Sequence, residues 1–253
     1  MKKIIAVCMC MLLSAAMLAG CGGAKGSAMQ KDTLTVGTNA EFPPFEYVDD
    51  NGEPDGFDMA LIKAVGEKMG KQVEIQNMEF DSLVSSIGNK IDIAIAGMTV
   101  TEERKKTVDF SDSYYTAVQY VILAKDSTIA SYDDLMNTKI GVQMGTTGDF
   151  IASDIAGSTV SRYNKGVDAV NDLLNGRLDC VIIDKNPAET FVGINSDTLM
   201  ALDGAQFDFE EESYAIAMPK GDAELVSAVN KAIGELKADG TYDELVKKYI
   251  GEN

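Results

Sequence analysis

Residues 139–183, KIGVQMGTTGDFIASDIAGSTVSRYNKGVDAVNDLLNGRLDCVII, decide the fold class of this chain. Short apolar runs alternate in this stretch with patterns of helical spacing. Strands that alternate with helices form a parallel sheet with helices packed on its faces. We therefore predict an α/β sheet with strands at 139–143, 160–163 and 178–183, and with helices at 149–155 and 167–174.

The same alternation occurs nearer the N-terminus. Apolar runs at 33–38, 73–78 and 91–96 lie on either side of helical patterns around 57–65 and 83–87. Two successive units of this kind predict two Rossmann-like α/β lobes rather than one long sheet.

Two longer apolar segments, Gln119–Ala124 and Tyr214–Met218, fall outside this alternation. Because the chain has to pass between the two predicted lobes, we interpret these segments as two crossing strands. The crossings are then expected near 114–120 and 213–218.

The C-terminal segment predicts two helices. Ala223–Lys237 has apolar residues on one face, and it ends near Gly240, a residue type that commonly terminates helices. Thr241–Tyr249 forms the second helix, for which Thr241 is the expected N-cap and Glu244 the capping-box partner.

The first residues predict export from the cell. Lys2 and Lys3 precede an apolar run at 4–18, and small residues follow it. This order is typical of a secretory signal sequence. The run is also shorter than the roughly 20 apolar residues that a membrane-spanning helix needs.

The motif Leu18-Ala19-Gly20-Cys21 resembles the lipobox of bacterial lipoproteins. The resemblance implies cleavage before Cys21 and attachment of lipid to Cys21. Residues 1–20 would then be the signal peptide, and 21–32 the lipidated cysteine and a polar tether. We expect such a protein to be anchored at the outer face of the bacterial cell membrane.

Charge and composition exclude several classes of function. The chain has 22 basic and 40 acidic residues, a net charge of −18, and no histidine. Such a negative surface repels phosphate backbones, which excludes nucleic acid as a partner. Cys180 is the one cysteine that follows Cys21. We therefore expect no transition-metal site and no cofactor.

Four polar clusters stand where predicted strands end, which is where ligands bind in open α/β sheets. The first is the loop after the strand at 33–38. Phe42 precedes two prolines that hold this loop extended, and we expect Phe42 in the pocket. Phe45 and Tyr47 fit a pocket position and a core position equally well.

The second cluster is residues 96–104. Gly97 allows a ligand to approach the backbone closely. Thr99 and Glu102 match a capping box, which predicts a helix start with free amide groups. Arg104 can hold a carboxylate through two parallel hydrogen bonds. The alternative is an exposed arginine on a helix of mixed charge, and the spacing alone favours that alternative.

The third and fourth clusters are residues 143–148 and Asp184. The sequence QMGTTG at 143–148 offers amides and hydroxyls to an anion. Asp184 ends a buried strand, where it can accept from an ammonium group or cap the helix that follows. Together the four clusters provide donors for a carboxylate, an acceptor for an ammonium group and an aromatic wall. These groups complement a zwitterionic amino acid.

Six segments carry a family resemblance: GTNAEFPPF at 37–45, GFD at 56–58, AGMTVTEERKK at 96–106, DFS at 109–111, GTTG at 145–148 and GTY at 240–242. Through them the chain resembles the polar amino-acid-binding proteins of ABC importers, which are extracellular solute-binding proteins of the type II periplasmic fold. The resemblance implies two lobes that close on the ligand, 33–116 plus 217–253 and 118–212. It also implies an ABC importer as partner, and we expect a monomer.

The resemblance further implies a role for each residue of the site. Arg104 would bind the α-carboxylate, assisted by backbone groups of Gly97 and Thr147 and by the Thr99 hydroxyl. Asp184 would hold the α-ammonium group. The other implied ligand-binding positions are Phe42 and Phe80, which sandwich the ligand side chain, Ala96, and Asn39 and Gln143, which vary with the ligand.

The expected ligand is a basic amino acid, arginine or lysine. The negative net charge favours cationic ligands, and Glu41 and Glu46 flank Phe42, so either can meet a cationic tail. Glutamine is the alternative, because Asn39 replaces an aspartate that is frequent in the family and Ala96 resembles glutamine binders. A periplasmic dehydratase of the same fold is the alternative class. We expect no enzyme, because the clusters contain no evident acid–base pair.

Overall fold

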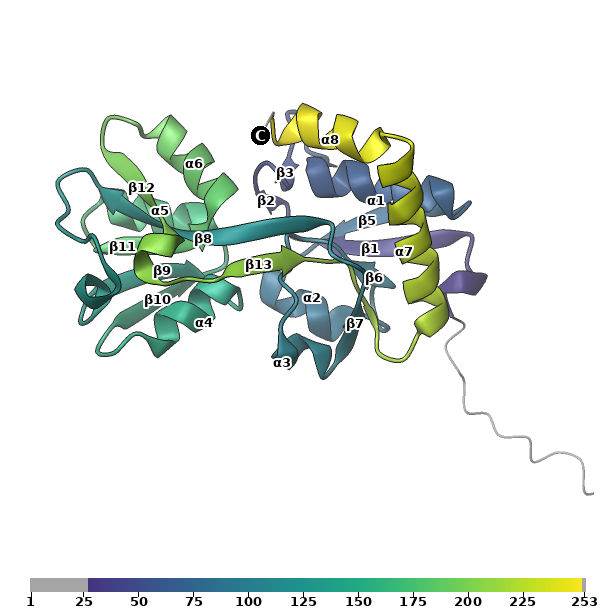
Figure 1. Cartoon of the computed structure of the whole chain (residues 1–253), viewed down its shortest axis with the longest axis horizontal. Coiled ribbons are helices and arrows are strands. Elements are labelled where there is room, and N and C mark those ends of the chain that lie inside the picture. The colour runs from purple at the N-terminus through teal and green to yellow at the C-terminus, as the bar shows by residue number, and fades with distance from the viewer. Residues whose placement is uncertain (1–26, 252–253) are drawn as a thin grey trace, which may run out of the picture.

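The computed structural model describes residues 27–251 (Figure 1). The predicted signal sequence and Cys21 lie outside these residues. No helix within 27–251 is long and apolar enough to cross a membrane. Two large sheets, each packed against helices, form two lobes that Figure 1 shows side by side. The prediction of an α/β fold with two lobes is confirmed.

The first lobe contains a five-stranded sheet. Three neighbouring strands at one edge run parallel because the chain passes through a helix between them, and the remaining pairs are antiparallel. In spatial order the strands are β5 (Gln72–Asn77), β1 (Thr33–Thr38), β6 (Ile93–Ala94), β14 (Ala217–Pro219) and β7 (Val108–Phe110). The helices of this lobe are α1 (Phe57–Lys68), α2 (Phe80–Ser86), the short α3 (Glu102–Lys105), α7 (Ala223–Ala238) and α8 (Thr241–Tyr249). Figure 1 shows α1 and α8 on one side of the sheet and α2 and α3 on the other.

The second lobe repeats this architecture with antiparallel strands at one edge. Its strand order is β10 (Thr159–Tyr163), β9 (Lys139–Gln143), β11 (Cys180–Asp184), β8 (Tyr115–Ala124) and β12 (Leu199–Asp203), and β13 (Glu211–Tyr214) pairs with β8. The helices α4 (Thr147–Asp154), α5 (Gly166–Leu174) and α6 (Lys185–Ile194) cover it. Every residue of β11 is buried, which explains the continuous apolar run in the sequence.

The connection between the lobes overlaps the crossing expected near 114–120, but the apolar segments interpreted as crossings lie largely inside the sheets, since residues 217–219 of the second one pair within the first sheet. Residues 119–124 of β8 pair with β11 and β12, so this segment belongs to the second sheet. The part of β8 that pairs with β13 is 115–118, and these paired segments run between the lobes in Figure 1. The interpretation of 119–124 as a crossing is therefore wrong. The segment is apolar because it lies inside a sheet.

Helix α8 also begins differently from the prediction. Gly240 precedes it with φ of 86°, in the left-handed region that glycine adopts without strain. Thr241 is already helical, its backbone N–H donates to the Asp239 carboxylate at 3.0 Å, and the N-cap residue Gly240 has no side chain to cap this end. The predicted capping box of Thr241 and Glu244 is wrong, because the chain turns into α8 through the glycine.

A small antiparallel sheet places the loop after β1. Its strands are β2 (Glu41–Phe42), β3 (Glu46–Val48) and β4 (Pro54–Asp55). Short 3₁₀ turns complete the described elements at Ala28–Gln30, Tyr132–Leu135 and Gly204–Phe207.

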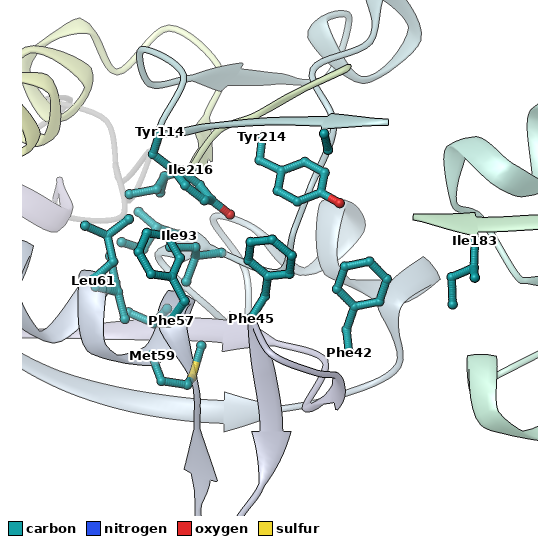
Figure 2. Close-up of a cluster of buried hydrophobic side chains, with 14 of the residues drawn as sticks. Phe42, Phe45, Phe57, Met59, Leu61, Ile93, Tyr114, Ile183, Tyr214 and Ile216 are labelled. Carbon is teal, nitrogen blue, oxygen red and sulfur yellow. The ribbon is translucent and has the colours of Figure 1, made fainter. Parts of the chain in front are cut away.

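Aromatic side chains anchor this loop to the core (Figure 2). The ring centre of Phe45 lies 5.0 Å from that of Tyr115 and 5.3 Å from that of Tyr214. Because Phe45 is fully buried, it belongs to the core and not to a pocket. Phe42 stacks on its outer side at 5.9 Å, which leaves the far face of Phe42 turned toward the second lobe.

Candidate ligand-binding site

A cavity lies between the two lobes. Every residue that the sequence predicted for ligand binding lines it. Glu46, which the sequence left as one of two alternatives, lines it as well, and so does Thr146, which was not predicted. The lining residues are Asn39, Phe42, Glu46, Phe80, Ala96, Gly97, Thr99, Arg104, Gln143, Thr146, Thr147 and Asp184.

The parallel strands explain this convergence. Asn39 follows β1, Gln143 ends β9 and Asp184 ends β11. The carboxyl ends of parallel strands meet at one edge of a sheet, and here the edges of two sheets face each other. Gly97 has φ of 51°, and a Cβ atom there would lie 2.9 Å from the ring of Phe42. Glycine thus lets the aromatic wall pack directly on the backbone.

Arg104 is a buried cation. Its Nη1 donates to the carbonyl of Thr99 at 2.6 Å, its Nη2 donates to the carbonyl of Gly145 at 3.0 Å, and its guanidinium lies 5.4 Å above the ring of Phe80. Desolvation lowers the pKa of Arg104 to about 10, although the charges of Glu212 and Asp184 oppose this shift. The alternative of an arginine on an exposed helix face is therefore wrong.

Arg104 also differs from other arginines of the described chain. Arg162 and Arg177 form ion pairs with Asp149 and Asp172. Within residues 27–251, Arg104 has no such pair with a carboxylate. A buried guanidinium without an anion is costly, so the cavity is suited to receive one.

The helix that carries Arg104 is capped by Thr101. Its hydroxyl accepts from the backbone N–H of Arg104 at 3.1 Å, and α3 begins at Glu102. The predicted capping role of Thr99 is wrong, because the helix starts later than expected. The Thr99 side chain is thereby free to face the cavity.

Asp184 is buried at the second lobe's edge of the cavity. It stands at the N-cap position of α6, but its side chain forms no capping bond. Its Oδ1 instead accepts from the Tyr214 hydroxyl at 2.5 Å. Burial and the charge of Glu212 raise the pKa of Asp184 to about 7, while hydrogen bonds from Tyr214 and Gln119 act in the opposite direction. A cationic partner would stabilise the charged form of a carboxyl group in this position.

Glu46 is the second buried acid of the cavity. Its side chain is fully buried, and within residues 27–251 no N–H or hydroxyl donates to either carboxyl oxygen. Burial, followed by the charge of the neighbouring Asp58, raises the pKa of Glu46 well above its ordinary value. Asp58 is better satisfied, because it accepts from the N–H of Gly97 and from the Tyr114 hydroxyl, both at 2.8 Å. Its pKa is raised by burial to about 6.

Glu41, the alternative to Glu46, does not line the cavity. Its carboxylate forms an ion pair with Lys165 of the second lobe at 2.6 Å. Asn39 bridges the lobes too, since its Oδ1 accepts from Gln143 Nε2 at 2.8 Å and its Nδ2 donates to the carbonyl of Met78 at 2.9 Å. With the bond from Arg104 to Gly145, these contacts join the two lobes around the cavity.

Comparison with known proteins places the chain in a family. Residues 34–252 match the model of the bacterial extracellular solute-binding proteins, family 3. The chain is 36% identical to the arginine-binding extracellular protein ArtP of Bacillus subtilis (strain 168), over 99% of this chain and 98% of that protein.

Solved structures agree with this assignment. An ancestral arginine-binding protein bound to arginine is 41% identical with a TM-score of 0.83, over 87% of this chain and 99% of that one. An ancestral arginine-binding protein bound to glutamine is also 41% identical, with a TM-score of 0.82, over 88% of this chain and 99% of that one. Sequence and fold lead to the same assignment, and the chain belongs to the bacterial extracellular solute-binding proteins, family 3.

Proposed function

We propose that this protein captures a basic amino acid, arginine or lysine, between its lobes and delivers it to an ABC importer. The observation that carries this proposal is the charge pattern of the cavity. A buried arginine without an anion, Arg104, lines the same cavity as two buried acids, Glu46 and Asp184. A basic amino acid has one carboxylate and two cationic groups, which matches this set.

Each charge of such a ligand has a partner in this arrangement. The guanidinium of Arg104 would receive the α-carboxylate, because a planar guanidinium binds a carboxylate through two parallel hydrogen bonds. Asp184 would hold the α-ammonium group, and Glu46 the cationic tail. Phe42 and Phe80 would enclose the side chain between them, as aromatic faces attract a guanidinium. The relatives named for arginine support this assignment.

Glutamine is the second candidate ligand. The amides of Asn39 and Gln143 line the cavity, and both pair with neutral groups. A protonated Glu46 would accept a neutral amide in place of a cation. The structure of a related arginine-binding protein bound to glutamine favours this candidate.

A competition titration tests the choice of ligand. The purified protein is saturated with labelled arginine and titrated with unlabelled arginine, lysine and glutamine. We expect arginine to displace the label at the lowest concentration. Displacement by glutamine at an equal or lower concentration would overturn the basic ligand and leave amino-acid capture intact. Failure of all twenty amino acids to bind would overturn capture itself.

Closure of the lobes is the proposed mechanism of capture. The lobes we propose are 33–116 plus 217–253 and 118–212. Because each lobe supplies part of the cavity, a bound ligand stabilises the closed form relative to the open one. The importer would distinguish the closed form from the open form, and we propose that the protein acts as a monomer and catalyses no reaction.

We also propose that lipid on Cys21 anchors the protein at the outer face of the membrane. The motif LAGC at 18–21 supports this. Cys21→Ser should release the protein from the membrane fraction, because position 21 then has no thiol to carry the lipid. Cell fractionation followed by immunoblotting measures this, with Cys180→Ser as the matched control that should stay with the membrane. A Cys21→Ser variant that remains membrane-bound would contradict the lipid anchor.

A further inference from the structure

Glu212, on the strand β13 that runs between the lobes, contacts two residues that line the cavity, Thr99 and Thr147. Its Oε2 accepts a hydrogen bond from the hydroxyl of Thr99 and another from the hydroxyl of Thr147, the latter at 2.8 Å. Thr99 follows β6 in the first lobe, and Thr147 begins α4 in the second. One carboxylate oxygen therefore joins two hydroxyls of the cavity from opposite lobes.

These two hydrogen bonds determine the direction in which both threonine hydroxyls donate. A carboxylate can only accept, so each threonine has to donate its single proton to Glu212. The oxygen of Thr147 also accepts from Gln119 Nε2 at 3.1 Å, which uses one of its lone pairs. The oxygen of Thr99 keeps both lone pairs. Toward the cavity these hydroxyls are acceptors, and they have no proton left for a ligand carboxylate.

Tyr214, two residues after Glu212, contacts another residue of the cavity, Asp184. Residues 212 and 214 of β13 project from the same face of the strand. The Tyr214 hydroxyl donates to Asp184, and Glu212 accepts from Thr99. The backbone of Thr99 is also paired with Tyr214 in an isolated bridge, so the strand and the site hold a fixed register.

We propose that Glu212 is a positioning residue that turns the Thr99 hydroxyl into an acceptor for the ligand α-ammonium group. In this arrangement Thr99 and Asp184 hold the ammonium group together, and Arg104 binds the carboxylate without help from the Thr99 hydroxyl. The inference rests on the proposed capture of an amino acid, and it reassigns the role that the family resemblance implied for this hydroxyl.

The rival interpretation is that Glu212 occupies the place of the ligand carboxylate. In that case Glu212 would compete with the ligand for Thr99, Thr147 and Arg104. The two interpretations predict opposite effects of removing the charge, because an orienting residue helps binding and a competitor hinders it.

The experiment compares two ligands on the Glu212→Gln variant. Arginine carries the α-ammonium group, and δ-guanidinovalerate is the same molecule without it. An amide at position 212 donates as well as accepts, so it no longer forces both hydroxyls to donate. We expect the Kd for arginine to rise about tenfold, the size of one hydrogen bond to a charged group. The Kd for δ-guanidinovalerate should stay within about twofold, because that ligand has no ammonium group to lose.

Controls separate the possible outcomes. Glu211→Gln, on an exposed neighbour in β13, should bind both ligands like the parent. Thr99→Val should reproduce the selective loss for arginine, since it removes the same acceptor. An equal loss for both ligands in Glu212→Gln, or tighter arginine binding, would overturn the inference. If the parent binds glutamine and not arginine, the basic ligand fails while glutamine and glutaramate serve as the same test pair.

Discussion

Arg104→Ala is expected to abolish high-affinity amino-acid binding. Removal of one partner of a buried, hydrogen-bonded charge pair typically costs about 2–5 kcal/mol, or roughly 30- to several-thousand-fold in Kd. The effect should fall at the high end, because Arg104 has no carboxylate partner of its own within residues 27–251 and the ligand would be its anion. The substitution also removes the bond to Gly145 that spans the lobes. Isothermal titration calorimetry with the preferred amino acid measures the change.

Two further variants sharpen this test. Arg104→Lys keeps the charge and loses the planar two-pronged contact, so it should also bind poorly. Lys106→Ala is the matched control, because Lys106 is an exposed neighbour whose ion pair with Glu103 lies at the surface. It should change binding by less than about 1 kcal/mol. Near-parental affinity of Arg104→Ala would contradict a carboxylate site at this residue.

The strands of the two sheets could be predicted well from the sequence. The observed bounds of β1 and β9 are those predicted, and β11 begins two residues and ends one residue later than expected. Strands buried on both faces appear as short apolar runs between helical patterns, so the signal is local. The error at 119–124 has the same origin, since a strand inside a sheet and an apolar crossing have the same composition.

The site could be predicted in part. The strand ends and the family resemblance predict three site residues, Arg104, Thr99 and Asp184. The structure brings all three to one cavity. Whether Arg104 was buried or exposed could not be decided from the mixed charges around it. That depends on Phe80, on which the guanidinium lies, and on the second lobe, which supplies the carbonyl of Gly145.

Glu46 and Glu212 illustrate why the remaining site residues could not be predicted from the sequence. Glu41 and Glu46 flank the same aromatic residue in the sequence. Glu46 lines the cavity, whereas Glu41 forms an ion pair with Lys165, which lies far along the chain in the other lobe. Glu212 accepts hydrogen bonds from two hydroxyls that come from opposite lobes. Such contacts are tertiary, and no local pattern encodes them.

We propose that the buried carboxyl group of Glu46 selects the charge of the ligand, so Glu46→Gln is expected to change specificity. The substitution keeps the size of the side chain and removes its charge. A cationic tail would lose its partner, and the affinity for arginine should fall by about 2–5 kcal/mol. Glutamine should bind as well as before or better, because a neutral amide pairs with a neutral amide. Titration of both ligands on parent and variant measures the ratio of the two dissociation constants.

The pH dependence of the same titration supplies an independent reading of Glu46. Burial and the charge of Asp58 raise the pKa of Glu46 well above its ordinary value, and the pKa of Asp58 itself is raised to about 6. A raised pKa means that the Glu46 carboxyl group binds a proton more readily, and a cationic ligand has to displace that proton. Arginine should then bind more weakly as the pH is lowered, whereas glutamine, which needs no proton release, should bind with little change.

Glu53→Gln is the matched control, since Glu53 is exposed and does not line the cavity, and it should leave both the specificity and the pH profile as in the parent. In Glu46→Gln the arginine profile should flatten, because the proton-binding pair is broken. Retention of the parental arginine affinity and pH profile in that variant would show that the cationic tail has another partner. The cavity would then be selective through Asp184 and the aromatic walls alone, and glutamine would become the stronger candidate ligand.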